Sequence, residues 1–233
     1  MDSVLHWNLD EPTKKAAMDH PLLQAYNRPA VQFAGCSTHT VTWNDRVVQP
    51  SSWGNQPLIS SPNEIMNQFR NRRYTQGLAL VVSWGGMGRT SQYIYADRRT
   101  EMIQKIETRI SDCANSISES RSVANSWLML TGIADGQLGW SEVMASKMLH
   151  FLSRSLRFEQ NPPVALDGGR IRNRIWPMFW KSLPLNQRPG DWEGRSFDAY
   201  SRYMTAVSTW AGQKGWTTTE TEATLVHLAD VAA

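Results

Sequence analysis

Apolar residues recur every three or four positions along most of the chain beyond Ser61, a spacing typical of helices that bury one face. The clearest stripe predicts a helix over residues 98–117. Its members are Met102, Ile103, Ile106, Ile110, Cys113 and Ile117. Further helices are expected from Ser61, over about 119–133 and from Ser141 to about Arg157. Another should run from Asp167 to a kink or end at Pro177. The last two are expected from Ser196 to Gly212 and after the capping box of Thr217 and Glu220. The sequence therefore predicts a mainly α fold.

Two stretches depart from this helical pattern. Residues 1–60 contain frequent proline and glycine and little periodicity, so we expect an irregular segment that packs on a helical domain of residues 61–233. Within it, HTVTWNDRVVQ alternates around Asn44-Asp45, which predicts a small β-hairpin. The apolar run Leu78–Trp84 is compatible with a buried strand or with a buried helix turn.

A short glycine-containing link joins two of the predicted helices, so that residues 119–157 read as helix, hairpin, helix. The link contains Gly136 and Gly139 around Gln137-Leu138. Such a turn can direct backbone N–H groups at a phosphate, and it can equally be a plain corner between two helices.

Composition excludes several classes of protein. Of the 233 residues, 41% are hydrophobic and 19% are charged, as in a globular domain rather than a disordered chain. No apolar run is long enough to cross a bilayer, and we expect neither a membrane partner nor a secretory signal. Cys36 and Cys113 are isolated, which favours a reducing, cytoplasmic setting. The histidines His39, His150 and His227 are too scattered for a ligand set, so no metal or other cofactor is expected.

Positive charge is concentrated in one part of the chain. The formal net charge is only +3, but residues 146–181 hold seven basic and two acidic residues. Three of the basic residues, Arg170, Arg172 and Arg174, directly follow Asp167, and the first and last are spaced to share a helix face. They could grip the phosphates of a nucleic acid, or they could form an ordinary solvated face.

Lys147 is a candidate nucleophile. Its neighbours one helical turn away are Val143, Met144 and Phe151, so its amine should be partly desolvated. Desolvation disfavours the ammonium form and lowers the lysine pKa, and a neutral amine can attack a sugar carbon to form a Schiff base. The alternative is a lysine whose stem packs while its amine reaches water.

Asp167 is a candidate partner for this lysine. The helix that holds Lys147 continues about ten residues beyond it, and the Pro-Pro turn and residues 164–166 can run back over that distance. Asp167 also stands where a helix N-cap would stand, and the two roles are compatible. A carboxylate held there stays ionised and can stabilise positive charge that develops on a sugar.

The hairpin, the stretch ASKMLHFL (145–152) and VALD (164–167) together resemble the helix-hairpin-helix DNA glycosylases, in particular the branch with the 8-oxoguanine DNA glycosylase fold. The resemblance covers about residues 120–180. It implies that Lys147 is the Schiff-base nucleophile, that Asp167 is the essential carboxylate, and that Gly136, Gly139 and Ser146 contact DNA. The chain departs from the family at the hairpin tip, which lacks Gly-Val-Gly, and at VALD, which replaces Pro-Val-Asp.

The function implied is removal of a modified base that has been rotated out of duplex DNA, with or without a following strand-nicking step. A further resemblance, to bacterial anti-phage glycosylases of this fold, implies glucosylated 5-hydroxymethylcytosine as the base. Alternatives are an 8-oxoguanine glycosylase and lyase of base-excision repair and a DNA-binding module without catalysis. Trp84, Trp140 and Trp176 are candidates for the base pocket or are core residues, among 11 tryptophans in all. No obligatory protein partner is inferred.

Overall fold

The computed structural model describes residues 10–24, 26–29, 39–40, 59–85, 99–132, 140–158, 163–181 and 196–231. Most of these residues are helical, so the prediction of a mainly α chain is confirmed. The strands within the described ranges are a single short pair, β1 (His39–Thr40) and β2 (Ile59–Ser60), which run antiparallel with His39 opposite Ser60. The turn predicted at Asn44-Asp45 lies outside the described residues.

The N-terminal part contains two helices that the sequence pattern did not predict, α1 (Glu11–Met18) and α2 (Pro21–Gln24). Helix α1 has an acidic residue and a proline in its first turn, both favourable at a helix N-terminus. It buries only Thr13 and Ala17, so its apolar stripe is too short to show a helical period. The expectation of an irregular segment is therefore wrong for residues 11–24.

Three helices follow β2: α3 (Pro62–Arg70), α4 (Tyr74–Trp84) and α5 (Arg99–Ser120). Ser61 caps α3, as its hydroxyl accepts a hydrogen bond from the backbone N–H of Glu64 at 3.2 Å. The apolar run of uncertain type is helical and forms most of α4. A side chain on Gly77 would collide with the ring of Phe69, so glycine at this position permits the close packing of α3 on α4.

The predicted helix pair is present as α6 (Val123–Thr131) and α7 (Glu142–Ser155). Helix α6 begins later than expected because α5 continues to Ser120 and ends where Arg121 adopts a left-handed backbone, with φ of 55°. The N-cap prediction at Ser141 is confirmed, since its side chain accepts a hydrogen bond from Met144 N–H at 3.3 Å.

The last part of the chain is helical in four pieces: η4 (Gly168–Ile175), α8 (Trp176–Lys181), α9 (Phe197–Lys214) and α10 (Thr218–Val231). The wide π-helix η4 begins with Ile171 N–H and Arg172 N–H both bonded to the carbonyl of Asp167, at 3.0 and 3.1 Å. The expected kink or end at Pro177 is replaced by a change from π to α geometry at Trp176. Pro177 is then the second residue of α8, where a missing N–H costs little.

The two remaining helix starts are confirmed in detail. Ser196 caps α9 through a 3.3 Å bond from Ala199 N–H, and Thr217 and Glu220 form the reciprocal capping box of α10. Helix α9 ends at Gly215, whose φ of 66° is the left-handed conformation that glycine adopts most easily.

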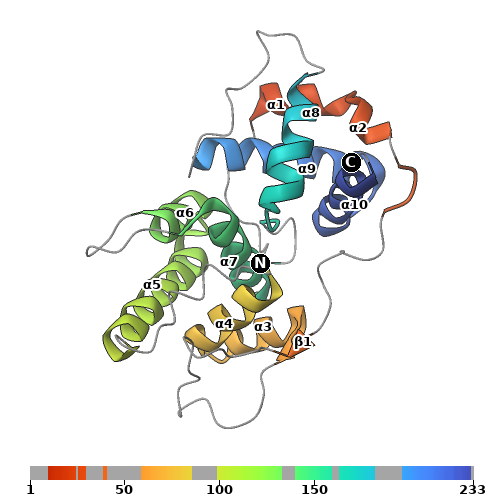
Figure 1. The fold of residues 1–233 in the computed structure, drawn as a ribbon. Coiled ribbons are helices and arrows are strands. Elements are labelled where there is room, and N and C mark those ends of the chain that lie inside the picture. Colours follow the sequence, from red (N-terminus) through yellow and green to blue (C-terminus); the bar gives the residue numbers. More distant parts are fainter. Residues whose placement is uncertain are drawn as a thin grey trace.

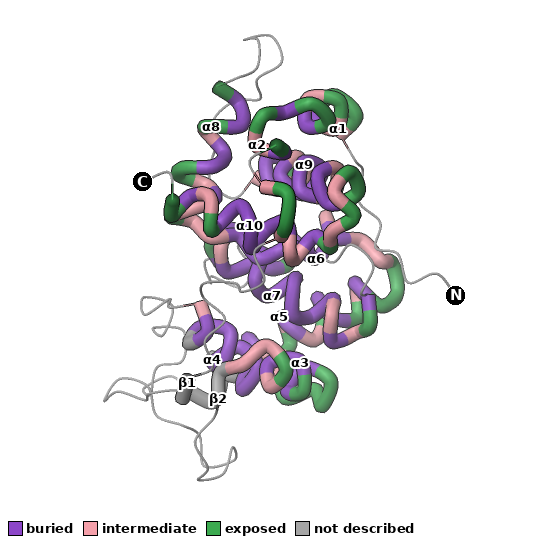
Figure 2. Tube along the Cα trace, turned by 90° about the vertical axis from the view of Figure 1, so that its right-hand side faces the viewer, coloured by how far each residue is buried: buried purple, intermediate pink, exposed green. Residues whose placement is uncertain are grey.

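The helices form two packed groups (Figures 1 and 2). The boundary along which the two groups meet is here called the seam. One, here called the central group, comprises α3 to α7. The other, the outer group, comprises α1, α2, η4, α8, α9 and α10, in which α1 packs on α9 and η4 packs on α8 and α10. Helix α6 also contacts α9 across the seam. None of the helices in the described part of the chain is both long enough and apolar enough to span a membrane.

Candidate active site

The segment Pro163–Asp167 runs along the seam and is fastened to α7. The hydroxyl of Ser146 accepts a hydrogen bond from the backbone N–H of Leu166 at 2.9 Å. One turn further along α7, His150 Nδ1 donates to the carbonyl of Pro163 at 2.8 Å. Residues 163–166 are buried, so these two bonds satisfy backbone groups that have no access to water.

Helix α9 holds the same segment from the opposite side. The hydroxyl of Tyr200 donates to the carbonyl of Val164 at 2.8 Å, and the backbone N–H of Val164 lies 3.3 Å from the Met204 sulfur. With contacts from both groups of helices, the segment has little freedom to move. Asp167, which follows this segment, therefore has a defined place beside α7, the helix that holds Lys147. This course agrees with the prediction from the sequence that residues 164–166 run back toward Lys147.

Asp167 is the N-cap of η4, which confirms that prediction. Its Oδ1 accepts a hydrogen bond from the backbone N–H of Arg170 at 2.7 Å, and its Oδ2 lies 3.4 Å from the Arg170 guanidinium. The side chain is 29% exposed, so solvent reaches the carboxylate. A carboxylate in this position combines a favourable helix dipole with access from outside.

Lys147 lies in the middle of α7 and is only 7% exposed. Its Nζ donates to the carbonyl of Gly85 at 3.5 Å and stands 5.5 Å from the centre of the Trp84 ring. Burial lowers the pKa of Lys147, and the charges of Asp167 and Glu222 partly oppose this shift. The desolvation predicted from the apolar neighbours is therefore present.

Glu222 is a third ionisable group of the site, and the sequence reasoning missed it. It lies on α10, is 2% exposed, and its Oε1 has no hydrogen-bond partner within the part of the chain that the structure describes. Burial raises the pKa of Glu222 well above its usual range; the Asp167 charge adds to the rise and the Lys147 charge opposes it. Glu222 also helps to raise the pKa of the buried Tyr200 and Tyr203 on α9, after burial itself.

A sequence signal for Glu222 did exist. It stands on the apolar stripe of α10, three and four positions before Leu225 and Val226, where a charged residue is out of place. Buried carboxyl groups are rare without a partner or a function. The capping residue Glu220 stands two positions earlier, and an acidic residue in the first turn is ordinary for a helix, so Glu222 does not stand out in the sequence.

The site therefore joins one amine from the central group to two carboxyl groups from the outer group. Burial shifts the amine toward its neutral, nucleophilic form, one carboxylate is partly exposed, and burial shifts the other carboxyl group toward its protonated form. Such a set can attack an electron-poor carbon, stabilise positive charge and hold a proton.

The three arginines after Asp167 do not form the free basic face that the sequence suggested. Each guanidinium donates to an acceptor of the protein. The acceptors are Asp230 Oδ1 at 2.6 Å from Arg170 Nε, a carboxylate oxygen of Glu142 for Arg172, and the Ala229 carbonyl at 3.1 Å from Arg174 Nη1. Periodicity could not predict this, because Glu142 and residues 229–230 come from distant parts of the chain.

The three candidate pocket tryptophans are all buried. Trp84 lies against Lys147 and meets the ring of Phe151 edge to face, with centroids 5.0 Å apart. Trp176 packs edge-on against Trp180, with centroids 4.9 Å apart. Trp140 is 3% exposed. Trp84 therefore contacts the candidate nucleophile.

Three residues in and near the hairpin were expected to contact DNA: Gly136, Gly139 and Ser146. Gly136 and Gly139 lie outside the described residues. Ser146 is fully buried, and its hydroxyl donates to Val143 O and accepts from Leu166 N–H, both at 2.9 Å. This position contradicts a direct contact with DNA and gives Ser146 a structural role instead.

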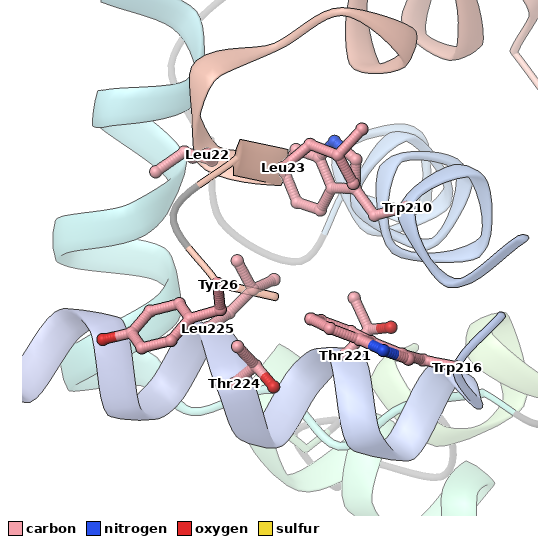
Figure 3. Close-up of a pocket in the computed structure, with 8 residues that line it drawn as sticks. All are labelled: Leu22, Leu23, Tyr26, Trp210, Trp216, Thr221, Thr224 and Leu225. Atoms are coloured by element: carbon pink, nitrogen blue, oxygen red, sulfur yellow. The ribbon is translucent and has the colours of Figure 1, made fainter. Parts of the chain in front are cut away.

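A separate pocket lies between α2, α9 and α10 (Figure 3). Its empty volume is about 250 Å³, part of which is open solvent. It is lined by Leu22, Leu23, Tyr26, Trp210, Trp216, Thr221, Thr224 and Leu225. None of the three tryptophans expected in a base pocket lines it, although Thr221 adjoins Glu222 in sequence.

In the described ranges, no group of three or more His, Cys, Asp or Glu side chains is arranged to hold a metal. The single cysteine there, Cys113, is buried, and burial raises the pKa of its thiol to about 12.

Comparison with known proteins returned nothing: no family model, no curated protein and no solved structure matches this chain.

Proposed function

We propose that this protein is a DNA glycosylase that uses Lys147 and Asp167 to release a modified base from duplex DNA. The observation that carries the proposal is a desolvated lysine amine whose charge interacts with a partly exposed carboxylate at a helix N-terminus. The resemblance of residues 120–180 to helix-hairpin-helix glycosylases supports the same assignment. In this proposal the seam between the two helix groups receives the extruded nucleotide.

The chemistry begins at C1′ of the sugar. The neutral amine of Lys147 forms a bond to C1′ while the bond from C1′ to the base breaks, and the base departs with the electron pair and takes up a proton. Asp167 stabilises the positive charge that develops on the sugar. The new C–N nitrogen then gives up two protons, one to a nearby carboxylate or water and one to O4′ as the C1′–O4′ bond breaks and the sugar ring opens, which gives an imine. Water then hydrolyses the imine to an abasic site and restores the lysine.

Burial of the amine serves this step. An ammonium group cannot attack C1′, and an amine in water is protonated at neutral pH. The low exposure of Lys147 weakens protonation, and the charges of Asp167 and Glu222 limit how far the pKa falls.

The identity of the base follows from resemblance rather than from the residues around Lys147. Glucosylated 5-hydroxymethylcytosine in phage DNA is the substrate we propose, and 8-oxoguanine is the second candidate. The two differ in size and in Watson–Crick edge, so a panel of duplexes separates them.

The test is borohydride trapping on duplexes that contain glucosylated 5-hydroxymethylcytosine, 8-oxoguanine or uracil. The wild-type protein should give a covalent adduct and an abasic product with one of them. Lys147→Gln should give no adduct, and Asp167→Asn should slow adduct formation by about 10²-fold or more, the scale of a lost electrostatic stabiliser. Binding without an abasic product from any duplex would replace the enzyme with a DNA-binding module.

A further inference from the structure

Three arginines crowd the turn between α3 and α4. Arg70, Arg72 and Arg73, here called the arginine turn, are all exposed. Arg70 donates to Asn67 Oδ1 at 3.4 Å, and no ion pair with a carboxylate is made by these three within the described part of the chain. The turn is therefore a compact positive surface, in contrast to the arginines of η4, whose guanidinium groups already donate to protein acceptors.

The backbone of this turn is unusual for its sequence. Arg72 has φ of 56°, the left-handed region that glycine adopts at least cost. The backbone N–H groups of Arg72 and Arg73 bond to the carbonyls of Phe69 and Gln68, at 3.0 and 2.9 Å, and so close the end of α3. Positive charge at a helix C-terminus explains Arg70, but Arg72 and Arg73 stand beyond the helix. Arg121 and Arg157, just beyond α5 and α7, adopt the same left-handed backbone, so this conformation defines the shape of the turn and the exposed charge defines its chemistry.

The turn has a fixed relation to the candidate active site through α4. This helix starts at Tyr74, directly after the arginines, and ends at Trp84, next to the Gly85 carbonyl that Lys147 contacts. Eleven residues of α-helix span about 16 Å. At about 3.4 Å per base-pair step, this length corresponds to about five steps along a duplex.

We propose that the arginine turn binds the phosphate backbone of duplex DNA about five base pairs from the nucleotide that enters the seam. This inference rests on the proposed function and adds where the DNA is held. Three guanidinium groups can release about three condensed counterions, which is the main source of affinity for a DNA backbone. The partner that fits is a regularly spaced polyanion, since the surface offers three exposed positive charges.

The experiment compares two variants that each lose three positive charges. The first is Arg70→Gln with Arg72→Gln and Arg73→Gln. The matched control is Lys14→Gln with Lys15→Gln and Arg28→Gln, which lie in or near α1 and α2 in the outer group. Affinity for a 30-base-pair duplex is measured by fluorescence anisotropy between about 0.05 and 0.3 M salt, and thermal melting checks that both variants fold.

The arginine-turn variant should lose about 10- to 100-fold in affinity at physiological salt, and the slope of log K against log salt should shrink by about 2 to 3. The control should keep most of the wild-type affinity and slope. Equal losses in both variants would show that only net charge matters and would overturn the proposal, as would wild-type binding by the arginine-turn variant.

Shortened duplexes test the distance. Wild-type affinity should fall when the flank on one side of the target nucleotide is cut from eight to three base pairs, and the arginine-turn variant should not respond to that cut. If the wild type excises a base but shows no such dependence, the inference fails while the glycosylase proposal stands. If the wild type neither binds nor excises, the proposed function fails.

Discussion

The hydroxyl of Ser146 accepts a hydrogen bond from the backbone N–H of Leu166 at 2.9 Å. Ser146 directly precedes Lys147 in the chain, and Leu166 directly precedes Asp167. Two residues that are twenty positions apart are thus brought to the same place by a bond between their neighbours. The bond is buried, so it fixes the two backbone segments from which the amine and the carboxylate project.

Removal of that bond should disturb the site more than the fold. Ser146→Ala leaves the Leu166 N–H buried without a partner and should lower the free energy of unfolding by about 1 to 3 kcal/mol. It should also slow single-turnover excision by about 10-fold or more, since small displacements of reacting groups are costly. Ser155→Ala is the matched control, because the Ser155 hydroxyl bonds only within α7, to Leu152 O at 2.7 Å. Equal excision rates in the two variants would contradict the positioning role.

Asp167→Asn separates the capping role of Asp167 from its charge. Asparagine caps a helix about as well as aspartate, so the bond to Arg170 N–H and the melting temperature should be nearly unchanged. Asp167→Ala should instead cost about 1 kcal/mol. Both variants should lose excision activity, measured with excess enzyme. A fully active Asp167→Asn would leave the residue as a cap and nothing more.

The reactivity of Lys147 should rise with pH through a midpoint below that of an ordinary lysine, because burial lowers its pKa. The charge of Glu222 opposes this lowering, so Glu222→Gln should move the midpoint to still lower pH. The measurement is an NMR titration of the Lys147 side chain, with the pH profile of borohydride trapping beside it. A shift toward higher pH would show that Glu222 does not act on the amine through its charge.

His150 should make the fold sensitive to mild acid. Burial, and then the charge of Arg154, lower its pKa from 6.5 to about 4, although its bond to Pro163 O opposes the shift. Below pH 6.5 the unfolded chain binds a proton that the folded chain excludes, so stability falls as the pH drops from 6.5 to about 4. The loss for this one fully buried group is about 3 kcal/mol. Denaturant melts at several pH values should show a smaller acid loss for His150→Gln, and an unchanged one for His227→Gln, which alters an exposed histidine.

Arg172 should matter for stability rather than for DNA affinity. It pairs with Glu142, whose side chain is only 7% exposed, and Arg172→Gln leaves that carboxylate buried without its partner. The expected loss is about 1 to 3 kcal/mol in unfolding free energy, with a salt slope of DNA binding close to that of the wild type. A slope reduced by about 1 would instead return Arg172 to the DNA interface.

Local rules predicted much of the fold. The caps at Ser141 and Thr217 and the helix starts at Ser61 and Ser196 were readable because a helix start depends on residues within one turn of each other. Helix α1 was not readable, because it buries a short, weakly apolar face. The π geometry of η4 was also missed, since nothing in GGRIRNRI distinguishes it from an ordinary helix start.

The candidate site was predicted in part, for a related reason. Lys147 and Asp167 were found because each stands in a local pattern, an apolar helix turn and a helix N-cap. Glu222 comes from a helix 55 or more positions further on, and its place beside them depends on how the two groups of helices pack. The acceptors of the three η4 arginines were missed in the same way.

The amine and the carboxyl groups come from opposite sides of the seam, and this division couples reactivity to shape. The contacts of the amine with Gly85 O and the Trp84 ring lie on its own side of the seam, and the two carboxyl groups lie on the other. If the two helix groups drew apart, the amine would lose the two negative charges that favour its protonated form. The proton affinity of this lysine therefore depends on how closely the two groups pack.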